Sequence, residues 1–215
     1  MAYRKVLTWP NPGLKAVAEP VQDFSSIQGI LQDMYDTLNV KMGAGLAATQ
    51  IGLGKRIVII KCSSFGAEPP TTWDYDKNIW VLINPEISVS SEDYQVWEEA
   101  CLSVPGASGL VRRHQDVKVD FLDPQGNSHS VDIPWPLAGA VQHECDHLDG
   151  ILYIDRMNKK SATDLKRRLI WIRNQKKKKA LKLARALKRE KKQENRIDTR
   201  VTHGPGKRKR KKKKK

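Results

Sequence analysis

The sequence predicts an α+β fold in which antiparallel β-sheets surround one central helix, with a further helix at the C-terminal end. Two observations lead to this prediction. Short runs rich in β-branched residues lie mainly before residue 136 and are linked by turn-forming residues, a pattern typical of antiparallel sheets and not of a doubly wound fold. Apolar residues recur at helical spacing before these runs, directly after them, and again beyond residue 160.

The first half of the chain begins with a helix. Residues 23–41 place apolar side chains at helical spacing after an acidic, Ser-rich start. Gly43-Ala44-Gly45 then ends this helix. The segment RIVIIKC, which begins at Arg56, is rich in β-branched residues and predicts a buried strand. Residues 63–78 are mostly polar, contain two adjacent prolines and predict a loop.

The second half contains three more strands and the central helix. IWVLINPEISV predicts a strand in which Pro85 marks a turn or an edge. VKVDFLD predicts another strand, closed by the turn DPQGN, and SVDIPW predicts a short third one. From Pro136 to about Leu148, apolar residues precede a polar run, which predicts a mostly buried helix.

Charge is divided unevenly along the chain. Residues 1–160 contain 14 Lys and Arg against 20 Asp and Glu, a net charge of −6, whereas residues 161–215 contain 25 basic and 4 acidic residues, a net charge of +21. The formal net charge of +15 is therefore a property of the tail and not of the preceding domain. We expect a folded domain over residues 1–160, a basic helix over 161–195 and a disordered polybasic tail over 196–215.

The central helix carries a metal-binding pattern. Residues 142–150 read QHECDHLDG, in which HECDH is an H-E-x-x-H motif. Positions four apart on a helix differ by only about 40° in direction, so His143 and His147 can reach one ion. Glu144 lies beside them, where it can act as a base toward a water molecule. Chance spacing on a solvated helix is the alternative, and the apolar residues just before the motif weaken it.

Two histidines do not complete a hydrolytic metal site, and exclusion indicates the third protein ligand. The longer motif H-E-x-x-H-x-x-G-x-x-H has its glycine here as Gly150, but Tyr153 stands where the last histidine would be. The later glutamates, Glu190 and Glu194, lie in a lysine-rich stretch. Upstream, EEACLSVPG places Cys101 among small and apolar residues before a Pro-Gly turn. A thiolate from a turn and two imidazoles from a helix make a Cys-His-His site with an open fourth position for water.

Three blocks of the chain occur in a characteristic order: GAGLAATQ (43–50), EACLS (99–103) and QHECDHL (142–148). In this order they resemble the peptide deformylase family, whose blocks are G-x-G-L-A-A-x-Q, E-G-C-L-S and Q-H-E-x-D-H-L. The opening VLTWPNPGLK is also similar to the family's V-L-x-x-P-D-P-x-L-R. Ala100 replaces the usual glycine, and it would strain the loop if that glycine served a positive φ. The resemblance covers about residues 4–158. It implies hydrolysis of the formyl group from N-terminal formylmethionine on new polypeptides, with release of formate.

The resemblance implies a metal site and a proton shuttle. Cys101, His143 and His147 would hold one divalent ion, and Glu144 would take the proton of the attacking water and later pass one to the leaving amine. Fe²⁺ is the native ion that the family implies, although Zn²⁺ generally binds such ligands more tightly. Zn²⁺, Ni²⁺ or Co²⁺ would also fit the isolated protein.

The resemblance also implies groups that contact the substrate. The side-chain amide of Gln50 and the backbone N–H of Leu102 would stabilise negative charge on the formyl oxygen, although Gln50 taken alone could be an ordinary polar residue ending a glycine-rich turn. The segment around Gly45 would pair with the nascent peptide as a strand. Close helix packing is the alternative role for Gly139 and Ala140, which would otherwise border the methionine pocket. The expected substrate-binding residues are Gly43, Ala44, Gly45, Leu46, Glu99, Gly139 and Ala140.

Compartment and partners follow from composition. Three scattered cysteines form no disulfide framework, and no stretch of about 18 apolar residues could cross a membrane. We expect a cytoplasmic protein without a signal peptide, and a monomer.

The tail beyond Ser161 has apolar residues at helical spacing and ends in KRKRKKKKK. A solvated helix with a disordered end is the simplest interpretation. The functional interpretation is attachment to a polyanion through counterion release, which for a deformylase would be ribosomal RNA near the peptide exit. A nucleic-acid-binding protein on a degenerate enzyme scaffold is disfavoured because the ligands, the base and the oxyanion donors are all present. An endopeptidase is disfavoured by Tyr153 and by the cysteine block.

Overall fold

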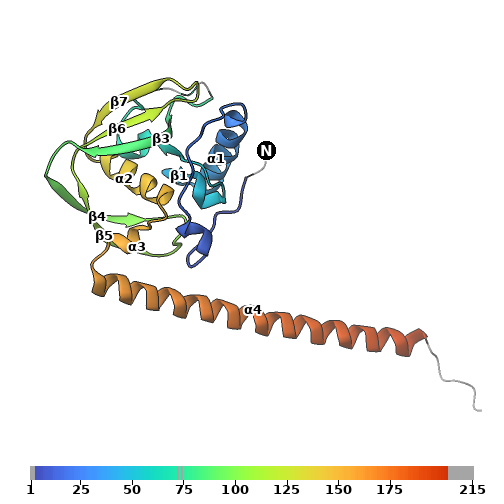
Figure 1. The fold of residues 1–215 in the computed structure, drawn as a ribbon. Coiled ribbons are helices and arrows are strands. Elements are labelled where there is room, and N and C mark those ends of the chain that lie inside the picture. Colours follow the sequence, from blue (N-terminus) through green and yellow to red (C-terminus); the bar gives the residue numbers. More distant parts are fainter. Residues whose placement is uncertain (1–2, 72, 74, 203–215) are drawn as a thin grey trace, which may run out of the picture. The chain divides into compact units, whose positions relative to one another are not determined.

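The computed structural model describes residues 3–71, 73 and 75–202 and confirms the predicted α+β fold. Residues up to Leu165 form one compact unit, and the chain from Lys166 onward forms a second. In the first unit every strand precedes helix α2 (Leu137–Leu148), which lies between two antiparallel sheets (Figure 1). None of the described helices is long and apolar enough to cross a lipid bilayer.

The larger sheet has five strands in the order β1-β2-β3-β6-β7, and every neighbouring pair is antiparallel. Pro85 does not end its strand; it lies where the register between β3 and β6 shifts. The strands are β1 (Gly45–Ala47), β2 (Ile57–Lys61), β3 (Ile79–Val89), β6 (Val117–Leu122) and β7 (Ser128–Ile133).

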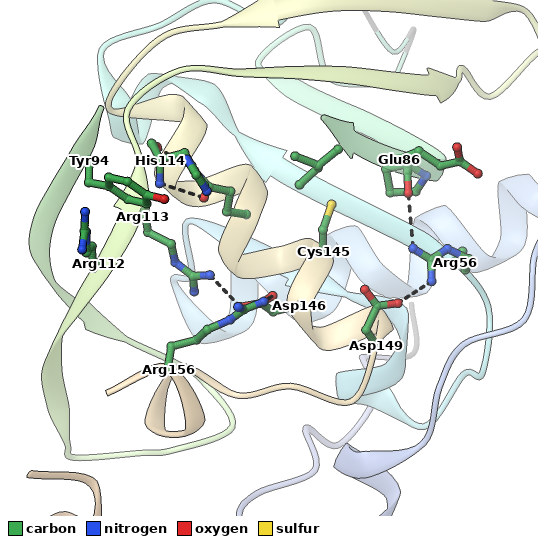
Figure 2. A pocket seen from close by; sticks show the side chains of 13 residues that line it. Arg56, Glu86, Tyr94, Arg112, Arg113, His114, Cys145, Asp146, Asp149 and Arg156 are labelled. Carbon is green, nitrogen blue, oxygen red and sulfur yellow. Dashed lines mark hydrogen bonds and ion pairs between the residues drawn. The ribbon is translucent and has the colours of Figure 1, made fainter. Parts of the chain in front are cut away.

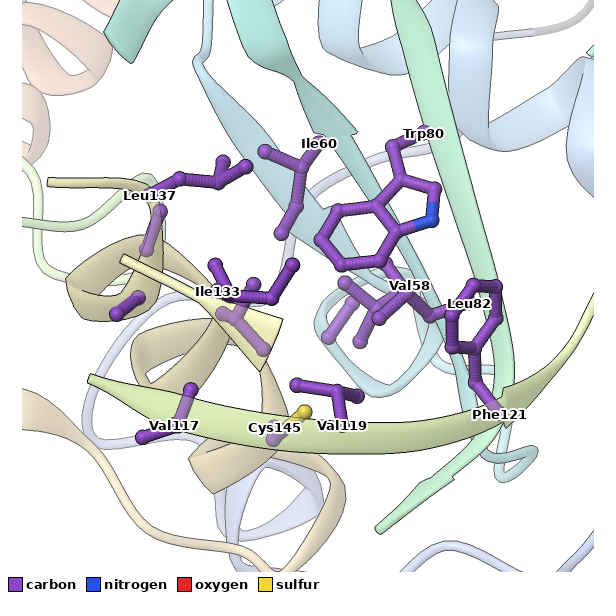
Figure 3. Packing of buried hydrophobic residues seen from close by; sticks show 14 of the residues in the cluster. Val58, Ile60, Trp80, Leu82, Val117, Val119, Phe121, Ile133, Leu137 and Cys145 are labelled. Atoms are coloured by element: carbon purple, nitrogen blue, oxygen red, sulfur yellow. The ribbon is translucent and has the colours of Figure 1, made fainter. Parts of the chain in front are cut away.

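The two faces of this sheet pack against different helices, because successive residues of a strand point to opposite faces. In β2, Ile57 and Ile59 pack in the cluster that contains helix α1 (Ile27–Lys41), whereas Val58 and Ile60 pack in the cluster that contains α2. Figure 3 shows the α2 cluster, in which Cys145 contributes its small side chain to the apolar packing. Both faces are covered, which explains why β2 is apolar along almost its whole length.

The smaller sheet, formed by β4 (Tyr94–Ala100) and β5 (Ser108–His114), is not predicted by the sequence. Its pattern of burial is mixed. Val96 and Leu110 are exposed, whereas Glu99 and Arg113 are buried together with Val111. The usual division, with apolar residues facing the core and polar residues facing solvent, is therefore not followed. This hairpin contacts α2 through β5 and brings Cys101, the residue after β4, next to the helix.

The end of α2 explains Gly150. The Ile151 N–H donates to the Asp146 carbonyl at 2.9 Å and the Gly150 N–H to the His147 carbonyl at 3.3 Å, which is a Schellman motif. Gly150 has a φ of +69°, and a Cβ there would lie 2.6 Å from the carbonyl oxygen of Lys15. The glycine that matches the longer zinc-protease motif is therefore required by the end of the helix. The remaining short helices are η1 (Pro12–Lys15), η2 (Ala48–Ile51), η3 (Cys62–Phe65) and α3 (Tyr153–Arg156).

Helix α4 (Lys159–Thr202) differs from the expected basic helix at both ends. It begins two residues earlier than residue 161 and continues past residue 195, so residues 196–202, expected to be disordered, are helical. The first helix-breaking residues after this point are Gly204 and Pro205, which accounts for the longer helix. Residues 203–215, the rest of the expected disordered tail, lie outside the described residues.

Candidate metal centre

Three potential metal ligands converge between α2 and the end of β4. His143 and His147 lie one turn apart on α2 with ring centroids 5.1 Å apart, and Cys101 Sγ is 3.2 Å from His147 Nε2. The ligand atoms of the three residues all lie within 4.8 Å of one another. One sulfur and two imidazole nitrogens at this spacing fit a divalent ion of the Zn²⁺ or Fe²⁺ type and leave further coordination positions open.

Glu99 holds His143 in one orientation. Its Oε2 lies 2.6 Å from His143 Nδ1, which leaves Nε2 for a metal ion. Glu99 also accepts hydrogen bonds from Arg113 Nε at 2.8 Å and from Trp97 Nε1 at 2.9 Å. Burial alone would raise the pKa of Glu99, but the hydrogen bonds and charges of His143 and Arg113 outweigh it and lower this pKa to about 2. Both carboxylate oxygens are engaged by the protein, so the structure favours an orienting role for Glu99 over the expected substrate-binding role.

The arrangement continues through Arg113 to a second carboxylate, that of Asp146 (Figure 2). Arg113 Nη1 donates to Asp146 Oδ2 at 2.6 Å, and Arg156 Nη2 donates to Asp146 Oδ1 at 2.5 Å. The side chains of Arg113 and Glu99 are only 3% and 2% exposed, whereas that of Arg156 is 46% exposed. Arg113 was missed by the sequence analysis, since VRRH contains no motif that links it to a glutamate 14 residues earlier. Asp146 belongs to the QHECDHL block, where the acidic neighbour of a ligand could have indicated its role.

Replacing Arg113 by Met is expected to lower the free energy of unfolding by about 3–5 kcal/mol, because Glu99 and Asp146 would lose their buried counterion. Urea unfolding measures this change. Arg156→Met removes a guanidinium group from the same carboxylate at an exposed position, where an ion pair contributes about 1 kcal/mol or less. Similar losses in the two variants would contradict the importance of the buried pair.

Glu144 lies next to the three potential ligands and to strand β1. It is buried, and its Oε2 has no hydrogen-bond partner among the described residues. Burial raises the pKa of Glu144 to about 7, close to the value that suits a group exchanging protons at neutral pH. Gly45 leaves the space for this side chain, because a Cβ at position 45 would lie 2.8 Å from Glu144 Cδ.

The two residues expected to provide N–H donors, Gln50 and Leu102, lie near the potential ligands. Gln50 is buried, and its Oε1 accepts the Ala47 N–H at 2.8 Å, which leaves Nε2 to point toward Cys101 Sγ at 3.4 Å and Ser103 Oγ at 3.2 Å. Leu102 borders the same pocket, and its backbone N–H donates to no group among the described residues.

A pocket of about 770 Å³ opens onto these groups. Of the expected substrate-binding residues, Gly43, Ala44, Gly45, Glu99 and Ala140 line it.

Two expected substrate-binding residues lie outside this lining. The side chain of Leu46 is fully buried in the cluster that contains α1. A Cβ at Gly139 would lie 2.8 Å from atoms of both Trp97 and Trp135, so the structure favours close packing as the role of Gly139.

Ala100 and Tyr153 differ from the residues of the deformylase block and of the longer zinc-protease motif, and the structure accommodates both. Ala100 pairs with Ser108 in the β4–β5 ladder and is not among the described residues with positive φ, so alanine causes no backbone strain there. Tyr153, in place of a third histidine, stacks on the ring of His143 with centroids 6.3 Å apart. Its hydroxyl donates to the Ala107 carbonyl at 3.0 Å. The tyrosine therefore supports the ligand helix and the turn after Cys101.

A Cys-His-His group that could hold a metal ion, beside a buried carboxylate and next to a pocket, is the arrangement typical of a metal-dependent hydrolase. Comparison with known proteins specifies the family. The family model described as polypeptide deformylase matches residues 3–163, and the chain belongs to this family. As a peptide deformylase, the protein removes the N-formyl group from the N-terminal formylmethionine of nascent polypeptides.

Individual relatives agree with this assignment. The peptide deformylases of Hahella chejuensis and Pseudomonas aeruginosa are 38% and 36% identical to the chain over 170 residues, which is 79% of this chain and 95% of each relative. The crystal structure of a peptide deformylase from Legionella pneumophila superposes with a TM-score of 0.70 at 36% identity, covering 81% of this chain and 98% of that one. A structure of the Acinetobacter baumannii enzyme described as bound to Met-Ala-Ser has a TM-score of 0.63 at 31% identity, covering 73% and 99%.

Proposed function

We propose that Cys101, His143 and His147 hold the single divalent ion of this deformylase and that Glu144 carries the proton. The convergence of the three ligand atoms within 4.8 Å, beside a buried carboxyl oxygen that lacks a partner, is the observation that carries this proposal. A divalent ion bound there would lower the pKa of a coordinated water molecule and polarise the formyl carbonyl.

The residues of the chain then perform defined steps. Glu144 accepts a proton from the attacking water as the new C–O bond forms at the formyl carbon. Gln50 Nε2 and the Leu102 N–H donate hydrogen bonds to the formyl oxygen as its charge grows. Glu144 returns the proton to the methionine nitrogen as the C–N bond breaks. The amine thus leaves with one proton of the water, and the other stays on the formic acid product, which ionises to formate. Glu99 and Arg113 keep His143 oriented throughout.

The open edge of β1 provides a place for the peptide backbone. β1 is an edge strand, paired on one side with β2. The Ala44 carbonyl accepts the Lys61 N–H, and in an antiparallel ladder alternate residues bond to the neighbouring strand. Gly45 is therefore expected to direct its N–H and C=O to the open edge, where an extended substrate can pair with them. The Met-Ala-Ser complex of the A. baumannii relative supports an N-terminal methionine peptide as the ligand.

We propose Fe²⁺ as the native ion. The ligands also suit Zn²⁺, so the expected result is kinetic: activity is lost in air, and is preserved under anaerobic conditions or by substitution with Ni²⁺. Formate release by the iron, nickel and zinc forms, measured anaerobically at equal metal content, tests this expectation. Equal activities of the iron and zinc forms would contradict it.

We propose that the basic C-terminal segment binds ribosomal RNA near the peptide exit, in the cytoplasm, and that the enzyme acts there as a monomer. The net charge of +21 over residues 161–215 supports a polyanionic partner. Within α4, Lys176 to Lys179 form an uninterrupted run of four cations. Truncation after Leu165, the end of the first unit, is expected to leave hydrolysis of a short formyl-peptide nearly unchanged.

Replacing the four lysines from 176 through 179 by glutamine is expected to weaken ribosome binding. The slope of log Kd against log salt concentration is expected to fall by about 0.7 for each lysine that contacts a phosphate. Sedimentation with purified ribosomes at several salt concentrations measures both quantities. Arginine at the same four positions keeps the charge and serves as the control. Equal affinities of the glutamine and arginine variants would contradict ribosome attachment through this run.

A further inference from the structure

The pocket next to the metal centre has a cationic side that the sequence motifs do not include. Two exposed lysines, Lys5 and Lys41, line it, and both belong to segments that precede β1. The carboxylates of the lining belong instead to β4 and α2; they are Glu98, Glu99 and Glu144. The pocket therefore carries its positive and its negative side chains on different elements, and the two lysines are called the basic rim below.

The backbone holds Lys5 in place beside the pocket. The N–H of Arg4 donates to Thr37 Oγ1 on α1 at 2.9 Å. The N–H of Leu7 donates to the carbonyl of Gln50 at 2.7 Å. Lys5 lies between these two anchors, so its position along the pocket is set by α1 on one side and by the residues near the metal centre on the other.

Both ammonium groups of the basic rim are available to a ligand. Lys41 is the last residue of α1, and its Nζ lies 5.7 Å from the ring centroid of Tyr3, a contact that leaves its N–H donors unengaged. Within the part of the chain that the structure describes, neither Lys5 nor Lys41 forms an ion pair or a side-chain hydrogen bond. Two cations without a carboxylate partner favour a negatively charged ligand.

An extended substrate that pairs with β1 runs toward the basic rim. Its formyl end must lie at Glu144, which lies against Gly45. Beyond Gly45, Leu46 is fully buried and does not line the pocket, whereas Gly43 does. The peptide must therefore run from Gly45 toward Gly43, antiparallel to β1, and it advances about 3.4 Å per residue. Its third residue then lies opposite Gly43, two positions from Lys41.

We propose that Lys5 and Lys41 select substrates by charge and favour nascent peptides that have Asp or Glu as the third residue. A carboxylate at this position comes within reach of two ammonium groups. Each lysine is exposed, so each contributes a small, salt-sensitive attraction, but both act on the same group. This inference rests on the proposed pairing of the substrate with β1, and it adds a determinant of specificity that is separate from the N-terminal methionine.

The test compares C-terminally amidated formyl-Met-Ala-Glu-Ser with amidated formyl-Met-Ala-Gln-Ser. The two peptides differ by one charge and have no terminal carboxylate. For the wild-type enzyme with its metal, at low ionic strength, kcat/KM is expected to be roughly two- to tenfold higher for the glutamate peptide, mainly through a lower KM. In about 1 M salt, where the screening length is about 3 Å, this ratio is expected to fall toward 1.

Variants of the basic rim separate charge from other causes. Replacing Lys5 and Lys41 together by glutamine is expected to lower the ratio toward 1, whereas arginine at both positions keeps the charge and the preference. Lys118→Gln is the control, because it removes one exposed positive charge from β6 outside the pocket lining, and it should keep the wild-type ratio. The basic segment beyond residue 160 is present in every variant, so a change in the ratio reports on the rim alone.

The remaining outcomes contradict the proposal. Equal kcat/KM for the two peptides in the wild type, or an unchanged ratio in the double glutamine variant, would overturn the role of the basic rim while leaving the deformylase function intact. Loss of the preference in the double arginine variant would show that charge is not its cause and would overturn the proposal as well. A wild-type enzyme that releases no formate from either peptide would overturn the proposed function and this inference with it.

Discussion

Glu144→Gln is expected to lower kcat for formate release by about 10²- to 10⁴-fold while leaving KM and metal content close to the wild-type values. Glutamine has the shape of glutamate, so it fits the space that Gly45 leaves, but it cannot accept the proton of the attacking water. Steady-state kinetics with formyl-Met-Ala-Ser, together with metal analysis of the same preparation, measures the change.

Glu98→Gln is the matched control for this variant. Glu98 borders the same pocket but is exposed, and its carboxylate accepts a hydrogen bond from Ser108 Oγ at 2.5 Å. Its replacement should change kcat little. A Glu144→Gln enzyme that kept kcat within a few-fold of wild type would show that another group carries the proton.

Cys101→Ala is expected to remove the bound metal and with it the activity. Loss of a group that only supports a ligand lowers metal affinity roughly 10- to 100-fold. Loss of the ligand itself leaves the two imidazoles of α2, and we expect the affinity to fall by a larger factor. Metal analysis after dialysis, and titration of the apoprotein with Zn²⁺, measure this loss directly.

Cys145 provides the control for this variant. Cys145 lies on α2 between the two histidines in sequence, yet it packs into the apolar cluster beneath the sheet. Cys145→Ala should retain the metal and show only a modest loss of stability, of the order of 1 kcal/mol. Retention of a full equivalent of metal by Cys101→Ala would exclude the thiolate as a ligand.

The sequence predicted the parts of the site whose spacing along the chain is dictated by local geometry. His143, Glu144 and His147 could be placed together because a helix brings positions four apart to one face. Cys101 was predicted as a ligand because other candidate ligands could be excluded and because it lies in the EACLS block. The strands β2, β3, β6 and β7 were predicted from apolar runs that the structure buries against α1 and α2.

The parts that could not be predicted depend on pairing between distant segments. The β4–β5 hairpin buries Glu99 and Arg113 and exposes Val96 and Leu110, so hydrophobicity alone does not identify its inner face. The contact of Arg113 with Asp146 joins residues 33 positions apart. The space that Gly139 leaves for Trp97 arises only when β4 and α2 pack together. A local sequence pattern does not indicate contacts between residues that are this far apart in the chain.

The contact between Gly45 and Glu144 also determines how the enzyme can change over evolutionary time. Every amino acid other than glycine carries a Cβ, so no conservative replacement exists at position 45. A position that contributes no side-chain group of its own therefore limits where the carboxylate beside it can lie, because any replacement would displace Glu144. Drift or selection for new specificity is expected to spare this position and to act instead on walls of the pocket that are farther from the carboxylate.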